Sequence, residues 1–110
     1  MNEAILVTGD AIGSPDEKLG GILLSNFLRL LGNREQLPKY IILLNAGVKS
    51  AARDSENLDF LKKLEERGVD IISCQTCVDY FGIEDQIAAG RIDGMVNIEE
   101  ILLTHNSLTI

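Results

Sequence analysis

Two cysteines, separated by two residues, are the side chains of this sequence best suited to covalent chemistry. Cys74 comes just after an apolar segment at residues 69–72, and Cys77 lies three positions further on. The thiolate is the reactive form of cysteine, and unpaired N–H groups at the start of a helix favour it. We expect a helix to begin at Cys77, which would present this thiol to a substrate. Cys74, at the end of a buried strand, is expected to lie inward or half covered.

The alternative for each cysteine is inert packing, because a free cysteine often behaves as a small apolar side chain. We keep that interpretation for Cys74, whereas the position of Cys77 between a strand and a helix favours a reactive thiol. Acidic side chains close in sequence would raise the pKa of Cys77 if they faced its sulfur: Asp79, Glu84 and Asp85. Lys49 and Arg53, on a neighbouring loop, would offset them. The sequence leaves this electrostatic balance open.

Other chemistries of a cysteine pair fit less well. A cysteine–histidine hydrolase needs a histidine base within hydrogen-bond reach, but the only histidine, His105, is expected in a solvated loop at the opposite end of the sheet. A zinc site needs about four ligands, and Cys74 and Cys77 supply two. We therefore expect neither a metal nor an organic cofactor. A thioredoxin-type dithiol follows an early strand, whereas this pair follows the third, so thiol redox cycling through Cys74 and Cys77 is an alternative.

Short apolar runs alternate with segments of helical periodicity along the chain. Strands are expected at residues 4–7, 40–44, 69–72, 95–96 and 107–110. Helices are expected at residues 16–31, 54–67, 77–89, with a break near Gly82, and 98–103. This rotation is typical of a parallel sheet with helices on both faces. We predict a three-layer α/β/α fold with a five-stranded parallel sheet.

Right-handed crossovers place the carboxyl end of every strand at one edge of such a sheet, where ligands and catalytic groups collect. Three loops belong to this edge, at residues 8–14, 45–50 and 73–77. For the second loop the simplest expectation is that Gly47 permits a turn with positive φ. The functional alternative is that Asn45 and nearby N–H groups polarise a sulfur species held at Cys77. The glycines of the first loop match no phosphate-binding motif, and the acidic residues around them would repel phosphate.

Length and composition limit the class of protein. The 110 residues include 45% hydrophobic side chains, and 10 basic against 17 acidic side chains give a formal net charge of −7. We expect one domain over residues 1–110, with neither nucleic acid nor a membrane as partner. The first residues lack the features of a secretory signal, and two cysteines cannot make a disulfide scaffold. We therefore expect a cytoplasmic protein with reduced thiols.

Three segments together carry a resemblance to a known family: LLNAGVK at residues 43–49, LEERGV at 64–69 and CQTCVDYFG at 74–82. They resemble the DsrE-like sulfur-relay family, and most of all the C-terminal domain of YedF-type selenium-metabolism proteins. Residues 19–28 and 89–98 fit as well, so the likeness covers nearly the whole chain. One departure is Gln75, since the family commonly has glycine between the first cysteine and the threonine.

The resemblance implies a five-stranded parallel α/β/α fold, a cytoplasmic location and a protein that often forms homo-oligomers. It also implies that Cys77 occupies the position at which related proteins carry sulfur as a persulfide, and that Asn45 and Gly47 belong to the loop beside it. YedF-type proteins have a preceding sulfur-carrier domain, so either a separate partner with a reactive cysteine donates or accepts the sulfur, or this protein has a different role.

Our first hypothesis is a sulfurtransferase or sulfur carrier, in which Cys77 holds sulfane sulfur as a persulfide and relays it to a partner thiol. The expected supporting residues are Cys74, Thr76, Asn45, Gly47 and Lys49. Thr76 would donate a hydrogen bond to the sulfur or, equally, cap the helix.

The second hypothesis is a non-catalytic binding or assembly subunit of a sulfur-relay complex. Tyr80, Phe81 and Ile83 would then form part of a subunit interface, although Phe81 also suits the core.

Overall fold

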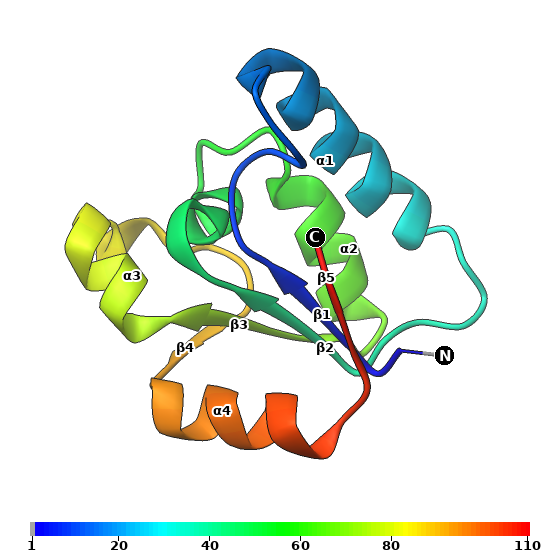
Figure 1. Cartoon of the computed structure of the whole chain (residues 1–110), viewed down its shortest axis with the longest axis vertical. Coiled ribbons are helices and arrows are strands. Elements are labelled where there is room, and N and C mark those ends of the chain that lie inside the picture. The colour runs from blue at the N-terminus through cyan, green and yellow to red at the C-terminus, as the bar shows by residue number, and fades with distance from the viewer. Residues whose placement is uncertain (1) are drawn as a thin grey trace.

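Five parallel strands form the centre of the structure (Figure 1). The computed structural model describes residues 2–110, and Met1 lies outside them. The strands are β1 (Ala4–Val7), β2 (Tyr40–Leu43), β3 (Asp70–Cys74), β4 (Arg91–Asp93) and β5 (Ser107–Thr109). Their order across the sheet is β4-β3-β2-β1-β5, and every neighbouring pair is parallel. The predicted five-stranded parallel sheet is therefore confirmed.

Helices cover both faces of this sheet, which gives the three layers that the sequence predicts. The helical elements are α1 (Glu17–Leu31), η1 (Asn45–Ala51), α2 (Leu58–Glu66), α3 (Gln75–Phe81), η2 (Glu84–Gln86) and α4 (Met95–Thr104). In Figure 1, α1 and α2 lie on one face of the sheet and α4 on the other. Among the described residues, no helix combines the length and the apolar character needed to cross a membrane.

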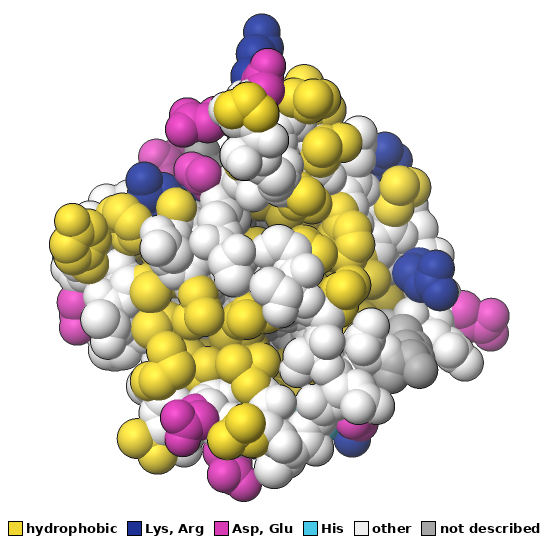
Figure 2. All heavy atoms as spheres, viewed as in Figure 1, with side chains coloured by type: hydrophobic (Ala, Val, Ile, Leu, Met, Phe, Trp, Pro, Cys, Tyr) yellow, Lys and Arg dark blue, Asp and Glu magenta, His cyan; other side chains and the backbone are white. Residues whose placement is uncertain are grey.

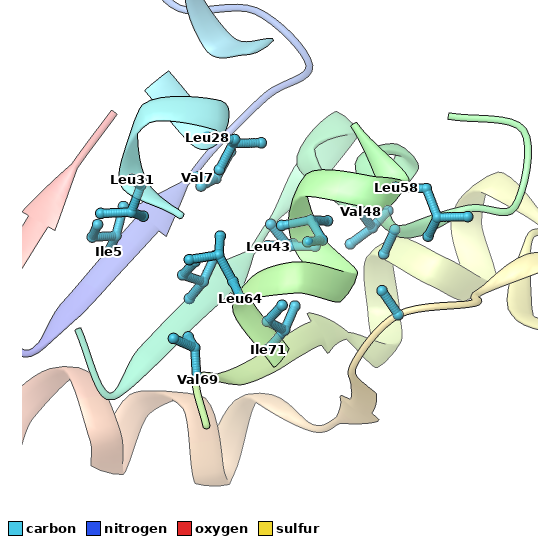
Figure 3. Close-up of a cluster of buried hydrophobic side chains, with 14 of the residues drawn as sticks. Ile5, Val7, Leu28, Leu31, Leu43, Val48, Leu58, Leu64, Val69 and Ile71 are labelled. Carbon is cyan, nitrogen blue, oxygen red and sulfur yellow. The ribbon is translucent and has the colours of Figure 1, made fainter. Parts of the chain in front are cut away.

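The strands are apolar at consecutive positions because each face of the sheet has its own core. Ile5, Ile41 and Ile71 are neighbours in the strand register and belong to the larger cluster, beneath α1 and α2 (Figure 3). Ile42 and Ile72 point the other way and pack with Ile98 of α4. Because the strands pair in this register, side chains on one face of the sheet join the larger cluster and those on the other face join the smaller cluster.

The bounds of α1 follow from its sequence. The Asp16 side chain accepts a hydrogen bond from the Leu19 N–H at 2.9 Å and caps the first turn. The helix ends at Gly32, as expected. Leu24 and Leu28 are buried against the sheet, whereas other large side chains of α1 stay more than half exposed: Leu19, Ile22 and Leu30. Figure 2, in the same view as Figure 1, shows hydrophobic side chains on the surface where α1 lies.

Two predicted elements are displaced in the structure. β4 lies at Arg91–Asp93 and not at residues 95–96, because residues 91–93 pair with the end of β3 whereas Met95 begins α4. α2 begins at Leu58 and not at residue 54, because the segment before it is held as a turn. There the Arg53 N–H donates to the Gln86 carbonyl, and Ala52 forms an isolated bridge with Ile87.

The third helix also differs from the prediction. α3 starts at Gln75, two residues before Cys77, and stops at Gly82, whose left-handed conformation (φ 66°) ends the helix. Beyond it, only the short η2 turn is helical in the segment predicted to extend to residue 89. The break expected near Gly82 is thus the end of the helix.

Candidate functional site

The two loops that carry the candidate site meet where β2 and β3 end. Asn45 begins η1 directly after β2, and α3 follows β3 without an intervening loop. β2 and β3 are parallel neighbours with Leu43 opposite Ser73. Their carboxyl ends therefore point to the same edge of the sheet, where η1 and the first turn of α3 contact one another. The loop predicted at residues 73–77 is wrong, because these residues form the end of β3 and the start of α3.

Asn45 is held in an unusual backbone conformation that aims its N–H at the cysteine sulfur. Its φ is 53°, in the left-handed region, which asparagine tolerates better than most residues. The Asn45 side-chain oxygen accepts a hydrogen bond from the Ala46 N–H at 2.8 Å, which fixes the turn. The Asn45 N–H donates to Cys77 Sγ at 3.1 Å. The sulfur therefore has a backbone donor from an adjacent loop.

Gly47 serves a different purpose from the one predicted. Positive φ in this loop belongs to Asn45, and Gly47 is not among the residues with that conformation. A Cβ on Gly47 would lie 2.5 Å from the Val7 carbonyl oxygen, far closer than atoms can approach. The Gly47 N–H donates to the Leu44 carbonyl at 2.9 Å. Glycine is thus required here because η1 packs directly against the end of β1, and this contact seats Asn45.

The two cysteines occupy different environments on α3. Cys74 takes the capping position before the helix and is 1% exposed, whereas Cys77 is the third helical residue and is half-buried. The prediction that Cys74 lies inward is confirmed, but Cys77 stands in the first turn and not at the first position. The hydrogen-bond donor at the Cys77 sulfur is the Asn45 N–H of the adjacent loop, and not the N-terminus of the short, seven-residue α3.

The pKa of the Cys77 thiol lies above the ordinary value for cysteine. Burial is the main cause, because it disfavours the charged thiolate. The Asn45 N–H opposes this effect by stabilising the thiolate, while the nearby Cys74 thiol raises the pKa further. The balance that the sequence left open therefore favours the protonated thiol in the free chain.

The charged residues considered from the sequence have little part in this balance. The Gln75 side-chain amide donates to Asp79 Oδ1 at 2.8 Å and to Glu84 Oε1 at 3.3 Å. Gln75 is thereby turned towards acidic groups and does not line the pocket described next. Lys49 is exposed, and its Nζ lies 4.5 Å from the centre of the Phe81 ring. It supports the aromatic wall of the site by a cation–π contact and is not seen at the sulfur.

A surface pocket of about 500 Å³ opens over the Cys77 sulfur. Its lining residues are Asn45, Thr76, Cys77, Tyr80 and Phe81. The Tyr80 and Phe81 rings pack edge to face with centres 5.3 Å apart, and Tyr80 is 84% exposed. Thr76 lies within the helix, so the capping role considered for it is wrong, because Cys74 holds that position.

The sequence reasoning named Tyr80 and Phe81 only as an interface or as core and missed them as walls of the pocket. Their spacing carried the signal: on a helix, residues three and four positions after Cys77 lie on its face. Of the predicted site residues, Asn45, Thr76 and Cys77 meet at the pocket. Cys74 and Gly47 are buried and Lys49 stands outside, so none of these three lines it.

His105 lies at the other end of the sheet, as expected, but it is not a solvated loop residue. Its Nδ1 lies 2.9 Å from the Ile101 carbonyl oxygen, and its ring packs edge to face on Tyr40 with centres 5.1 Å apart. Tyr40 begins β2, whereas Asn45 follows the end of that strand. The residues described by the structure contain no group of three or more His, Cys, Asp or Glu side chains arranged to hold a metal ion.

Comparison with known proteins finds a family whose model matches nearly the whole chain. The model of the DsrE/DsrF-like family matches residues 5–108. Similar solved structures include the ychN protein from E. coli, with 21% identity, a TM-score of 0.70 and full coverage of both chains. MTH1491 from Methanobacterium thermoautotrophicum, of unknown function, has 20% identity and a TM-score of 0.70 over 97% of this chain and 96% of its own.

A third structure, the conserved protein of unknown function BT1422 from Bacteroides thetaiotaomicron, has 21% identity and a TM-score of 0.61, over 98% of this chain and 95% of its own. At these identities the likeness establishes the fold. No curated protein matches the sequence.

Proposed function

Because the chain belongs to the DsrE/DsrF-like family, we propose that it is a sulfur carrier whose Cys77 holds sulfane sulfur as a persulfide. The family is associated with sulfur relay, and the fold and the site give this chain the parts such a carrier needs. The site has a thiol that is half-buried, a pocket over that thiol, and a backbone N–H aimed at its sulfur.

The contact between the Asn45 N–H and Cys77 Sγ is the observation that carries the proposal. In the loading step, the Cys77 thiolate attacks the terminal sulfur of a donor persulfide R–S–SH. A new S–S bond forms on Cys77, the donor's own S–S bond breaks, and the donor leaves as the thiolate R–S⁻. In the unloading step, a partner thiolate attacks the terminal sulfur of the Cys77 persulfide, and Cys77 leaves as the thiolate. The Asn45 N–H stabilises the negative charge on Cys77 sulfur in both steps.

The raised pKa of Cys77 makes the proposal more specific. Only a small part of the thiol is ionised near neutral pH in the free chain, so loading by a small persulfide should be slow and should accelerate as the pH rises. A protein donor that docks over the exposed Tyr80 ring would bring its own charges to the site. We therefore propose that relay takes place within a complex with a donor or acceptor protein that carries a reactive cysteine.

The proposal also covers the setting of the protein. We propose one domain over residues 1–110, in the cytoplasm, because its cysteines suit a reducing compartment. The exposed apolar side chains of α1 support a homo-oligomer, which light scattering of the purified protein would test. The most specific part of the proposal is that the chain resembles YedF-type proteins and is linked to selenium metabolism. Loading with a perselenide donor R–S–SeH in place of the persulfide R–S–SH, with R–S⁻ as the leaving group in both cases, addresses the cargo.

Mass spectrometry tests the central proposal. The reduced protein is incubated with a low-molecular-weight persulfide above neutral pH, freed of donor, and its mass is measured intact and after digestion. We expect the gain of one sulfur atom on the peptide that contains Cys77. Cys77→Ser should gain none. Equal sulfur on Cys77→Ser and on the wild type would refute Cys77 as the carrier.

A second candidate function is a non-catalytic subunit of a sulfur-relay complex. The raised pKa of Cys77 and the exposed Tyr80 ring favour it. The two functions differ in what a donor protein does to Cys77. A carrier becomes persulfidated when the donor is added, whereas an assembly subunit binds the donor through the Tyr80 surface and its Cys77 remains a free thiol.

A further inference from the structure

Cys74 is a buried nucleophile that the proposed relay does not use. It is 1% exposed and packs in an apolar cluster with Ile72 and Ile98. Cys77 packs against the same cluster. Its thiol lies near enough to Cys77 to raise the pKa of that residue. The structure therefore places the buried Cys74 thiol next to Cys77, the cysteine that lines the pocket.

The positions of the two cysteines on α3 suit a bond between them. Cys74 is the capping residue and Cys77 the third residue of the helix, two positions that lie close enough for each side chain to reach the other's backbone in a capping box. About one helical turn, roughly 5 Å, separates them. Disulfides join residues whose Cα atoms are roughly 4.4 to 6.8 Å apart. A Cys74–Cys77 disulfide thus requires no large movement of the backbone.

The pocket and Cys74 contact Cys77 from different sides. Cys77 lines the pocket and Cys74 does not. Because Cys77 lines the pocket and Cys74 is buried, we expect the outer sulfur of a Cys77 persulfide to project into the pocket, with Cys74 on the buried side of Cys77. Attack on a sulfur–sulfur bond proceeds through the sulfur that faces the incoming thiol. Cys74 is accordingly placed to attack the inner sulfur and to expel the outer one into the pocket.

We infer that Cys74 is a resolving thiol that discharges the Cys77 persulfide as hydrogen sulfide. This inference rests on the proposed function. The Cys74 thiol loses its proton and attacks Cys77 Sγ, so that a Cys74–Cys77 disulfide forms and the bond to the outer sulfur breaks. The outer sulfur leaves as HS⁻ and takes up the proton as H₂S. The sulfane sulfur is reduced and the two cysteine thiols are oxidised, so no external oxidant takes part. Two equivalents of a small thiol, or one dithiol, return the pair to its reduced form.

This activity would give the loaded carrier a limited lifetime. A partner thiol that enters through the pocket takes the outer sulfur and leaves Cys77 reduced. Without a partner, the Cys74 thiolate attacks Cys77 Sγ, and the outer sulfur is released as sulfide. The two routes leave different products on the protein, a dithiol after relay and a disulfide after discharge.

The test compares the wild type with Cys74→Ala after loading. Both proteins are reduced, loaded with a low-molecular-weight persulfide, desalted into thiol-free and oxygen-free buffer, and followed by intact mass and by a sulfide-sensitive electrode. The wild type should lose the added sulfur, end two hydrogens lighter than the reduced protein and release one sulfide per chain. Cys74→Ala should keep the added sulfur about tenfold longer or more, since an intramolecular attack is missing.

Three controls separate the outcomes. Circular dichroism and thermal melting establish that Cys74→Ala is folded, and Cys74→Ser, which also lacks the thiol, should behave in the same way. A wild type that accepts sulfur and keeps it as long as Cys74→Ala refutes the resolving role and leaves the carrier function standing. If neither the wild type nor Cys74→Ala takes up sulfur, and the wild type forms no disulfide, the carrier function is refuted and this inference with it. Sulfide release without disulfide formation also refutes the inference, because the electrons would then come from elsewhere.

Discussion

Replacing Asn45 tests whether the backbone donor of the neighbouring loop controls the reactivity of Cys77. In Asn45→Ala, the side-chain hydrogen bond to the Ala46 N–H disappears. The φ of 53° then becomes less favourable, because alanine lacks the polar side chain with which asparagine offsets the cost of about 1–2 kcal/mol for the left-handed conformation. We expect the loop to relax and to move its N–H away from Cys77 Sγ, which it now meets at 3.1 Å.

The size of the effect follows from the charge on the acceptor. A hydrogen bond to a charged group contributes about 1.5–3 kcal/mol. Loss of the lower value reduces the thiolate fraction near neutral pH by roughly tenfold, because about 1.4 kcal/mol corresponds to a factor of ten. The thiolate is the species that iodoacetamide alkylates. Alkylation of Cys77 in Asn45→Ala should therefore be about tenfold slower at pH 7, and its pH midpoint should move further into the alkaline range.

Asn45→Gly is the matched control, because glycine adopts the left-handed conformation freely and keeps the N–H in place. Its alkylation rate should stay within about twofold of the wild type. The modified residue is identified by fragmentation of the peptide that contains both cysteines, so that Cys77 is distinguished from Cys74. Equal rates in Asn45→Ala and wild type, with the fold intact, would refute the role of the N–H. An equal slowing in Asn45→Gly would assign the effect to the side chain and would refute the backbone argument.

Three further predictions concern stability and pH. Gly47→Ala should lower the free energy of unfolding in urea by about 1–3 kcal/mol, since its Cβ would lie 2.5 Å from the Val7 carbonyl oxygen; unchanged stability would contradict that close approach. Gly20→Ala should destabilise α1 by about 1 kcal/mol, because its Cβ would lie 2.7 Å from a side chain of the preceding loop. The adjacent Gly21→Ala meets only a distant oxygen at 4.0 Å and should stabilise the helix by up to about 1 kcal/mol, so equal melting temperatures of the two variants would be evidence against this packing. Because the pKa of Cys77 is raised in the folded protein, the unfolded chain loses this proton at lower pH. The contribution of Cys77 to the free energy of unfolding is therefore fully present below pH 9.0 and is lost as the pH rises from there through the raised pKa. In urea unfolding, the free energy of unfolding of Cys77→Ala should fall less at alkaline pH than that of the wild type, and equal losses would argue against the pKa shift.

Much of the fold was readable from local pattern, because burial on both faces of a parallel sheet demands continuous apolar strands. The runs at β1 and β2 gave strands at the expected places, and Asp16 and Gly32 marked the ends of α1. The prediction failed where long-range contacts decide the conformation. β4 is a strand because its residues pair with Ile72–Cys74 of β3, about 19 residues earlier in the sequence, and the ion pair of Arg91 with Asp70 only adds to this pairing. Its few residues carry no strong periodicity of their own.

The sequence by itself determined the chemical type of the site: a thiol at the junction of a strand and a helix, at the edge of the sheet where parallel strands end. Tertiary structure alone decided how that thiol is held. The N–H that faces Cys77 Sγ comes from Asn45, 32 residues earlier, and it points there because Gly47 lets η1 pack on the end of β1. The same packing buries Cys77 enough to raise its pKa. Both effects arise from solvent exclusion and contact between separate loops, which residue spacing along one segment does not encode.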